Sequence, residues 1–436
     1  MRVLILTIYH DPEPIPKTGE LARALQERGH EVTVVTAFPH YPDGNLYPGY
    51  RLRPWAWETR DGVRVLRTYI YPYHGTRALL RIVNYLSWMI SGVAAAWLTP
   101  PCDVIYVWHP PLTVGVTARI LSVLKRAPFV YDMQDLWPES ALASGLLKPG
   151  PLVSMLHALA RWVYRRADRI LVVSDTTARY LAGRGVEPAK IRIAKHWVDE
   201  SIFDTARSTR DVRAELGLGD RFVAMFAGNL GLVQGLDTLL DAAALLREEP
   251  MAVVFVGDGA DRARLEARAR EMGLSNVRFA GRHPATAMPD FFRAADALLV
   301  HLRPSAIAGH AVPTKMLAYL AAGRPIVCAV PGAAAELAHQ SGAGPVIPPG
   351  DPHALANALR HLAAMPASAR EALGARGRAY LHEHFNRFRV IGEYEAILRE
   401  AAAGPLSWPA RVRKRRGRFP GGGEELTAAG ERRGKM

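Results

Sequence analysis

The segment from His310 to Val327, HAVPTKMLAYLAAGRPIV, combines residue types that can bind an anion. A Pro-Thr-Lys turn opens it, an apolar helical stretch follows, and Gly323-Arg324-Pro325 closes it ahead of a buried strand. Lys315 stands where the predicted helix begins, so its ammonium group and the free N–H groups of the first turn are expected to converge on one ligand. The segment by itself predicts a cradle for a phosphate.

Four predicted strands in the second half of the chain each end in glycine or in a short polar loop. They are the apolar runs 222–226, 252–256, 277–280 and 297–301. Glycine at a strand end lets backbone N–H groups approach a ligand. Four such ends at one edge of a sheet, next to the Lys315 segment, indicate a nucleotide-binding domain.

The first half of the chain opens with one unit of a doubly wound parallel sheet. An apolar strand over 3–7, a loop, a helix and a second strand over 32–36 follow each other closely. Ligands of such sheets bind at the carboxyl ends of strands, so the loop that contains His10 is expected to belong to a site. Gly19 either lets the backbone approach a phosphate or serves only the turn before the helix.

Two further strands of this half, 103–108 and 129–132, end in polar residues over the same edge. His109 follows the first strand, and Asp135 and Glu139 follow the second. These carboxylates are the side chains of this half best suited to chemistry, because a carboxylate can orient or deprotonate a hydroxyl group. Each has an alternative interpretation as a helix N-cap or as a charge that faces solvent.

Two stretches of the first half leave their roles open. Residues 37–72 are dense in Tyr, Pro, Gly and Trp, which predicts either a loop whose rings stack on a sugar or lipid headgroup, or plain packing. Residues 77–98 carry no charge after Arg81 and have a polar stripe at helical spacing: Arg77, Arg81, Asn84, Ser87 and Ser91. We expect a buried crossover helix there, with a helix in a membrane interface as the alternative.

Length, composition and charge predict a folded protein with a basic tail. The 436 residues suggest two domains, and 49% hydrophobic with 22% charged residues is ordinary for folded chains. The formal net charge is +14, of which residues 404–436 carry +6 from nine Lys/Arg against three Glu. We expect this tail to be disordered and either solvated or attracted to an anionic membrane surface. No recognition motif accompanies it, so no nucleic-acid role is expected.

Several classes of protein are disfavoured. Cys102 and Cys328 lie in apolar surroundings, and their spacing suggests neither a disulfide framework nor a metal site. The run MRVLILTIY passes directly into Asp11-Pro12-Glu13, so no signal peptide is expected. The sequence lacks a Walker lysine loop, a dinucleotide fingerprint and a Ser/His/Asp order, which disfavours ATPases, dehydrogenases and hydrolases.

The predicted fold is α/β, with two doubly wound Rossmann-like domains that face each other across a cleft. Residues 201–385 are expected to form a nucleotide-binding domain, and residues 1–200 a domain that binds another substrate. A helix over 386–403 is a candidate to cross back to the first domain, ahead of the tail 404–436.

Several segments of residues 1–400 resemble retaining nucleotide-sugar glycosyltransferases of the family 4 type, which have the GT-B fold. Within that group, the chain is most similar to exopolysaccharide and O-antigen transferases related to the fucosamine and colanic-acid enzymes. The more specific segments are DLWPES (135–140) and VPTKMLAYLAAGRPIV (312–327). The others are GHEVTVVT (29–36), PHYPDGNLYPGY (39–50), AGNLG (227–231), VGDGADRARLE (256–266) and IPPGDPHALANAL (347–359).

The resemblance implies transfer of a sugar from a UDP- or GDP-linked donor, with retention at the anomeric carbon and without a metal or a cofactor. Relatives frame the donor with two glutamates separated by seven residues, and these positions are His310 and Ala318 here. The Arg and Lys that neutralise the diphosphate in relatives correspond to Asn229 and Gln234. Lys315 is therefore left as the evident cation on the donor side.

The resemblance also assigns roles along the cleft. Lys315 is expected to stabilise the departing diphosphate, and Asp135 and His109 to orient the acceptor hydroxyl group. The acceptor side is expected to include His10, Gly19 and Glu139. The expected donor-binding residues, with Arg303 as a further helper, are Gly228, Asn229, Gln234, Gly257, Arg282, His310, Pro313, Thr314, Lys315 and Ala318.

The expected function is hexosyl or N-acetylhexosaminyl transfer in the synthesis of a surface polysaccharide, such as an exopolysaccharide or the O-antigen of lipopolysaccharide. The expected partners are a nucleotide sugar, a lipid-linked or saccharide acceptor and an anionic membrane surface, with the enzyme peripheral on the inner face of the bacterial cytoplasmic membrane. The absence of both glutamates favours an alternative, a weakened relative that binds a nucleotide sugar as a scaffold. Another GT-B activity, an epimerase or phosphorylase, is disfavoured by DLWPES.

Overall fold

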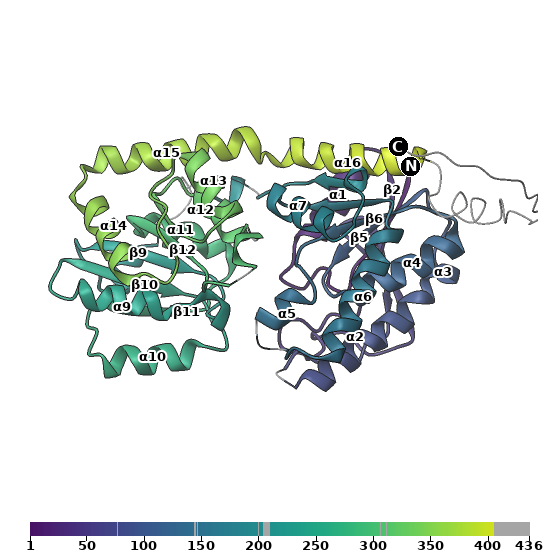
Figure 1. The fold of residues 1–436 in the computed structure, drawn as a ribbon, viewed down its shortest axis with the longest axis horizontal. Helices are drawn as coiled ribbons and strands as arrows, with labels where there is room; N and C mark the ends of the chain where they lie inside the picture. Colours follow the sequence, from purple (N-terminus) through teal and green to yellow (C-terminus); the bar gives the residue numbers. More distant parts are fainter. Residues whose placement is uncertain are drawn as a thin grey trace, which may run out of the picture.

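Two sheets, one in each half of the chain, organise this computed structural model (Figure 1). It describes residues 1–404 apart from 76, 144, 146, 199, 204–209, 306 and 311. The basic tail predicted over 404–436 lies outside the described residues from 405 onward. The arrangement confirms the predicted fold of two Rossmann-like domains, while the exact domain limits stay predictions.

The N-terminal sheet has eight strands in the order β3-β4-β2-β1-β5-β6-β7-β8, and only β3 and β4 pair antiparallel. Its strands are β1 (Arg2–Leu6), β2 (Glu31–Ala37), β3 (Trp55–Arg60), β4 (Val63–Thr68), β5 (Val104–His109), β6 (Phe129–Met133), β7 (Arg169–Val172) and β8 (Ile191–Ile193). Its helices are α1 (Lys17–Glu27), α2 (Ala78–Val93), α3 (Ala95–Leu98), α4 (Thr113–Lys125), α5 (Glu139–Ala143), α6 (Pro151–Arg166) and α7 (Asp175–Gly183). Central strands such as β5 are buried along their whole length, because helices cover both faces of the sheet.

The C-terminal sheet has five parallel strands in the order β11-β10-β9-β12-β13. They are β9 (Phe222–Ala227), β10 (Met251–Val256), β11 (Val277–Gly281), β12 (Ala297–His301) and β13 (Ile326–Ala329). The helices around it are α8 (Val212–Glu215), α9 (Asp237–Leu245), α10 (Arg262–Glu271), α11 (Met288–Ala294), α12 (Thr314–Ala321), α13 (Ala333–Ser341), α14 (Pro352–Ala364) and α15 (Ala367–His384). The predicted order of apolar strands and glycine loops corresponds to β9 through β12.

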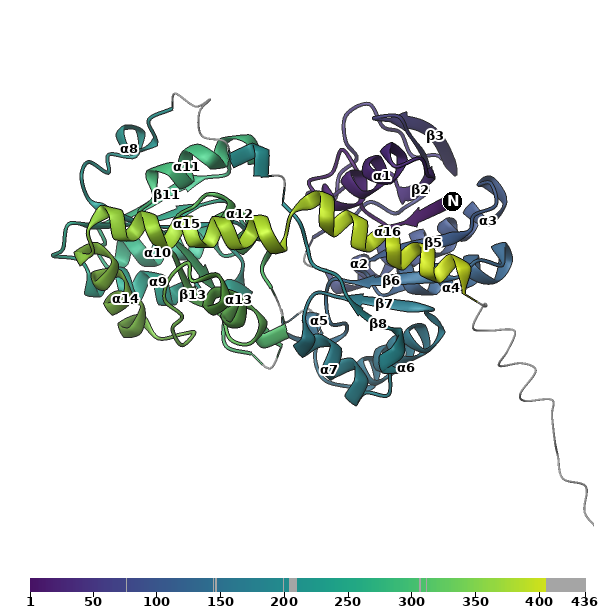
Figure 2. The same cartoon turned by 90° about the horizontal axis from the view of Figure 1, so that it is seen from above.

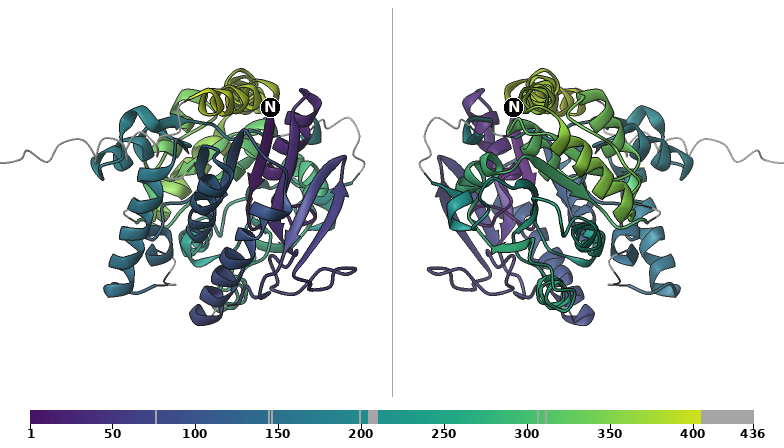
Figure 3. Two further views of the ribbon diagram at one scale, coloured as in Figure 1. Left: turned by 90° about the vertical axis from the view of Figure 1, so that its right-hand side faces the viewer. Right: turned by 90° about the vertical axis from the view of Figure 1, so that its left-hand side faces the viewer.

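The last described helix, α16 (Arg387–Ala403), continues from α15 and lies on the N-terminal domain beside α1 (Figure 2). Its apolar side is buried in the core of that domain through Val390, Ile391, Tyr394, Leu398 and Ala401. Views along the long axis show α15 and α16 almost end-on at one edge of the molecule (Figure 3). The two domains are thus connected both by the linker near residue 196 and by this helix pair.

The prediction of a buried helix over 77–98 is wrong. The helix α2 does cross from β4 to β5, but only Asn84, Trp88 and Gly92 of it are buried. The reason is that its polar stripe faces the protein, so its apolar residues project outward. Ala78–Leu98 is also the one described helical stretch that is long and apolar enough to cross a membrane by length and composition.

Replacing Glu395 by Gln should weaken the attachment of α16. The Glu395 carboxylate accepts from Arg28 at 2.9 Å and pairs with His30 at 2.9 Å. Burial alone would raise the pKa of Glu395, but hydrogen bonds from Arg28, His30 and Arg399 outweigh it and lower the pKa to about 2. We expect Glu395→Gln to lose about 1–3 kcal/mol of unfolding free energy at pH 7, measured by urea denaturation.

The pH dependence of this loss follows from linkage. A depressed carboxyl pKa stabilises the folded state above the ordinary value of 4.5, and the contribution disappears as the pH falls toward about 2. The difference between wild type and Glu395→Gln should therefore shrink steadily as the pH falls from about 5 to about 2, where the folded carboxylate is protonated. A difference that stays constant over this interval would contradict the assignment.

Candidate active site

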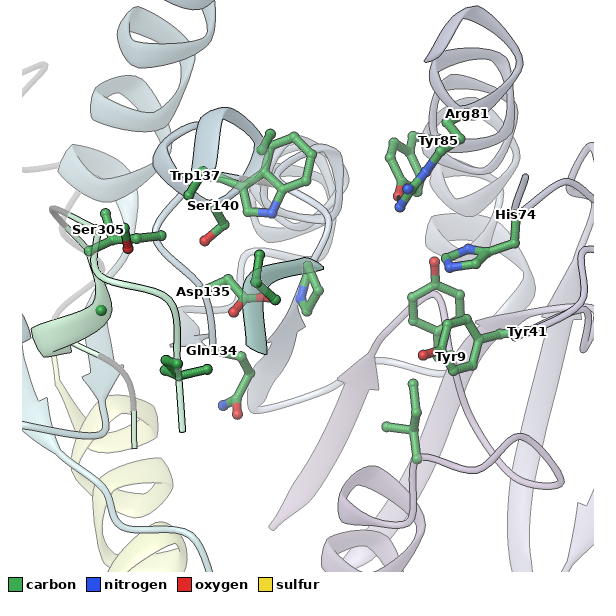
Figure 4. A pocket seen from close by; sticks show the side chains of 18 of the residues that line it. Tyr9, Tyr41, His74, Arg81, Tyr85, Gln134, Asp135, Trp137, Ser140 and Ser305 are labelled. Atoms are coloured by element: carbon green, nitrogen blue, oxygen red, sulfur yellow. Dashed lines mark hydrogen bonds between the residues drawn. The ribbon is translucent and has the colours of Figure 1, made fainter. Parts of the chain in front are cut away.

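A cavity of about 590 Å³ lies between the two domains, at the carboxyl ends of the strands (Figure 4). Its lining includes many aromatic and few charged residues. From the N-terminal domain these include Tyr9, Tyr41, His74, Arg81, Tyr85, Trp108, Gln134, Asp135, Trp137 and Ser140. The C-terminal domain contributes Val233, Leu302, Arg303, Ser305, Ile307 and Ala308.

One wall of the cavity is aromatic and carries a single arginine. The rings of Tyr9 and Tyr41 lie 5.0 Å apart, and those of Tyr41 and His74 lie 4.7 Å apart. Arg81 donates to the hydroxyl group of Tyr85 at 2.8 Å, its Nε is buried without a partner, and none of the described carboxylates forms an ion pair with it. The wall therefore combines ring faces that suit a sugar with a cation that suits a phosphate.

Glu13 holds the loops that build this wall. Its carboxylate is buried and accepts from the backbone N–H groups of His10, His40 and Tyr41 at 2.8–2.9 Å. Burial raises the pKa of Glu13 to about 7 although these three N–H groups favour the charged form. The loop after β1 and the loop after β2 are thereby joined beneath Tyr9 and Tyr41.

The facing wall carries the polar end of β6. The carboxyl group of Asp135 faces the cavity (Figure 4). Desolvation by the surrounding protein raises its pKa above the ordinary value. Gln134 donates to Asp132 at 2.5 Å, and Asp132 lies 3.1 Å from Lys17. This placement suits the predicted role of Asp135 in orienting an acceptor, which stays a prediction.

On the donor side, Lys315 reaches from the first turn of α12 to the end of β9. Its Nζ donates to Oε1 of Gln234 at 2.8 Å and lies 3.7 Å from the ring centre of Phe226. Among the described residues, no carboxylate forms an ion pair with this ammonium group. Burial lowers the pKa of Lys315 to about 7. A half-buried cation without a counter-ion is the charge pattern expected of a site for an anionic ligand.

Two glycines make room for this lysine. Gly228 has a φ of +141°, and a Cβ atom there would lie 3.0 Å from Nζ of Lys315. A Cβ atom on Gly257 would lie 2.0 Å from the carbonyl oxygen of Gly228. The two loops are therefore packed backbone against backbone, next to the ammonium group.

His301, at the end of β12, was not predicted as a site residue but positions this loop. Its Nδ1 donates to the carbonyl oxygen of Gln234 at 2.6 Å, and its Nε2 accepts from the N–H group of Gly350 at 3.1 Å. This pair of bonds requires a neutral ring, and burial lowers its pKa. In the sequence, only the position of His301 at a strand end could have indicated that it positions this loop.

The structure brings some predicted donor residues together and separates others. Gly228, Gln234 and Lys315 are in contact, Gly257 is adjacent, and Pro313, Thr314 and Ala318 lie on the first turns of α12. Asn229 and Arg282 are exposed on the loops after β9 and β11. His310 ends the short helix η6 (Ala308–His310), where its carbonyl oxygen accepts from Thr177 at 3.3 Å and its ring lies 5.0 Å from that of Tyr180. His310 therefore contacts α7 of the other domain.

Four predicted N-terminal residues do not reach the cavity. His10 is buried and its Nδ1 lies 3.1 Å from Thr18, while His109 is buried in the core with its pKa lowered to about 3 by burial. Gly19 lies inside α1, where a Cβ atom would come within 2.0 Å of the Asp11 carboxylate. Glu139 is paired with Arg184 at 3.0 Å and with the hydroxyl group of Tyr180. For His10, His109 and Glu139, the adjacent residues Tyr9, Trp108 and Ser140 line the cavity instead. The acceptor roles expected of the four residues stay predictions.

Most residues of the aromatic wall were not predicted from the sequence. The density of aromatic residues over 37–72 indicated Tyr41, and the polar stripe of α2 included Arg81, but neither signal distinguished a site from packing.

The described residues hold no group of three or more His, Cys, Asp or Glu that could bind a metal ion.

Both halves of the chain match models of known families. Residues 15–195 match a glycosyl transferase 4-like domain, and residues 221–365 match glycosyl transferases group 1. WcaI of Escherichia coli strain K12, which carries the name of a colanic acid biosynthesis glycosyl transferase, is 29% identical over 341 residues that cover 74% of this chain and 82% of that protein. D-inositol 3-phosphate glycosyltransferase of Thermomonospora curvata is 30% identical over 393 residues, which cover 83% and 87%.

A solved structure shares the fold. Alr3699/HepE of Anabaena, crystallised in complex with UDP, aligns with a TM-score of 0.66 at 17% identity. The alignment covers 92% of this chain and 100% of that one. Both domains and their relative placement therefore have a counterpart among known structures.

Replacing Lys315 by Met should stabilise the folded protein. Burial lowers the pKa of Lys315 to about 7 from 10.5, so the unfolded chain binds this proton more tightly and the wild-type unfolding free energy rises between these pH values. We expect Lys315→Met to be more stable by about 1–3 kcal/mol below pH 7, with the gain vanishing near pH 10. Urea denaturation at several pH values measures this gain, and Lys148→Met, at an exposed position, is the control. If Lys315→Met is less stable than wild type at pH 6, the charge of Lys315 is compensated in the folded protein.

Proposed function

The chain belongs to the family of GT-B glycosyltransferases, and we propose that it moves a sugar from a nucleoside diphosphate donor to an acceptor bound in the cavity between its domains. The observation that carries this proposal is the half-buried ammonium group of Lys315, which has no counter-ion among the described residues. A diphosphate supplies that counter-ion. Solved HepE holds UDP, which supports a uridine donor, with a guanosine donor as the alternative.

In the proposed reaction, the bond between the anomeric carbon and the β-phosphate oxygen breaks as the acceptor hydroxyl oxygen bonds to that carbon. Lys315 and the N–H groups at the start of α12 stabilise the negative charge that develops on the departing diphosphate. The hydroxyl proton passes to a diphosphate oxygen, and Asp135 orients the hydroxyl group. We propose retention at the anomeric carbon, supported by the resemblance of the 312–327 segment to retaining enzymes.

We further propose that the acceptor is a lipid-linked saccharide of a surface polysaccharide, met at the inner face of the cytoplasmic membrane. WcaI bears the name of a colanic acid biosynthesis enzyme, which supports this class of pathway. The aromatic wall of the cavity suits sugar rings, and Arg81 suits the phosphate of a lipid carrier. We propose that the transferred sugar is a hexose or an N-acetylhexosamine.

A second candidate function rests on the residues that replace the two family glutamates. Ala318 cannot hydrogen-bond a ribose, which removes about 1.5–3 kcal/mol of donor binding, and His310 contacts α7. A protein that binds a nucleotide sugar without transferring it would have these features. Measuring nucleotide release during incubation with UDP- or GDP-sugars and a lipid-linked acceptor decides between the transferase and the scaffold, because only transfer releases the nucleotide. Donor binding without nucleotide release from any pair would select the scaffold.

Replacing Lys315 by Ala should weaken binding of the donor nucleotide. Loss of a charge-assisted hydrogen bond worth about 1.5–3 kcal/mol corresponds to roughly 10- to 150-fold in the Kd of UDP or GDP, measured by calorimetry. Wild-type affinity should fall as the pH rises above about 7, because binding then requires Lys315 to take up a proton. The variant should lack this dependence, and equal affinities of both proteins at pH 6 would exclude Lys315 from the donor site.

Replacing Arg81 by Gln should impair use of a phosphate-linked acceptor. We expect KM for a lipid-diphosphate saccharide to rise about 10-fold or more, with the Kd for the nucleotide unchanged. Arg81→Lys should restore part of the loss because it returns the charge without the planar fork. An equal effect on a phosphate-free saccharide would show that Arg81 serves the wall rather than a phosphate.

A further inference from the structure

The polar side of α2 is bound to the protein. Nδ2 of Asn84 donates to the carbonyl oxygen of Tyr71 at 2.6 Å, and Oγ of Ser87 accepts from the N–H group of Tyr71 at 2.8 Å. Oγ of Ser91 donates to the carbonyl oxygen of Tyr69. These bonds satisfy the backbone that follows β4 and fix the rotation of the helix about its axis. The apolar side of α2 is consequently held outward.

The outward side of α2 and α3 forms one apolar stripe. Leu79, Ile90 and Trp97 are 71%, 70% and 73% exposed, and Val83 and Leu86 lie between them at 40% and 41%. The α2 members are spaced by four, three and four residues, so they share one side of the helix. A contiguous exposed stripe of this kind on a folded domain marks a contact surface.

The helices around this stripe are basic. α2, α3, α4 and α6 contain no Asp or Glu, but they contain six cations: Arg81, Arg119, Lys125, Arg161, Arg165 and Arg166. α4 packs against both α2 and α6, so the three lie on one side of the N-terminal sheet. A surface both apolar and positive complements anionic lipid headgroups, whereas a second copy of it would present like charge.

The stripe adjoins the cavity. Arg81 and Tyr85 line the cavity from α2, while Leu79 and Val83 of the same turns are exposed. In Figure 1, α2 lies at the lower edge of the N-terminal domain, and α16 runs along the opposite edge. A surface that covers the stripe therefore also meets the Arg81 end of the cavity.

We propose that α2 and α3 lie in the interface of an anionic lipid bilayer, with the stripe among the acyl chains and the basic residues of α4 and α6 at the headgroups. The inference rests on the proposed function, because it presents the cavity to a lipid-linked acceptor. Ala78–Leu98 is long enough to cross a bilayer, but the polar side of α2 stays hydrogen-bonded to Tyr69 and Tyr71 and cannot face lipid. The helix thus lies along the membrane surface.

Sedimentation of the full chain with vesicles tests the inference. Wild type should sediment with vesicles of equal parts phosphatidylglycerol and phosphatidylcholine, and at least about 10-fold more weakly with phosphatidylcholine alone or in high salt. The double variant Leu79→Glu with Ile90→Glu should lose about 10-fold or more of this binding. Phe388→Glu is the matched control, because Phe388 is 78% exposed on α16, and it should bind as wild type does.

The outcomes separate this inference from the proposed function. The double variant should keep the wild-type Kd for UDP or GDP and the wild-type unfolding transition, which excludes misfolding. If the double variant binds vesicles as tightly as wild type does, the attraction to lipid would be assigned to the tail 405–436, and the inference would be overturned. A dimer that the double variant converts to a monomer, without vesicle binding by either protein, would assign the stripe to a second copy and overturn it as well. Vesicle binding without any nucleotide binding would instead refute the proposed function alone.

Discussion

The charge of Lys315 is the constraint on which the donor side of this protein depends. Its half-buried ammonium group lies among Phe226, Gln234 and the backbone of Gly228, with no carboxylate within ion-pair distance in the described chain. Such an arrangement costs folding free energy and is useful only when an anion enters. By resemblance to the family, Asn229 and Gln234 stand where cations were expected. In the proposed donor site, Lys315 is therefore the cation that would neutralise the diphosphate.

The acceptor side depends on how the two domains are connected. Lys17 of α1 lies 3.1 Å from Asp132, 2.9 Å from the hydroxyl group of Tyr394 on α16 and 3.3 Å from His196 in the linker. Both connections between the domains therefore meet at one side chain. Asp132 in turn accepts from Gln134, whose side chain lines the cavity. The contacts that join the domains thus extend to the wall that would hold an acceptor.

The sequence predicted the sheets well because buried parallel strands are continuous apolar runs and their ends are marked by glycine. It placed Lys315 beside Gly228 for the same reason, since strand ends converge at one edge. It could not predict side-chain orientation: His109 and Trp108 are neighbours on β5, and only Trp108 lines the cavity. The burial predicted for α2 was also wrong, because the polar and apolar stripes of this helix both have helical period. The backbone of Tyr69 and Tyr71 bonds to the polar stripe, so that side faces the protein.

A crystal structure of the protein with a bound nucleoside diphosphate would show whether Lys315 neutralises the donor. We expect a phosphate oxygen within about 3 Å of Nζ of Lys315, with the side chain of Gln234 displaced from its present hydrogen bond. We also expect Gly228 and the start of α12 to contact the same diphosphate. A nucleotide bound elsewhere, with Lys315 still bonded to Gln234, would exclude Lys315 from the donor site.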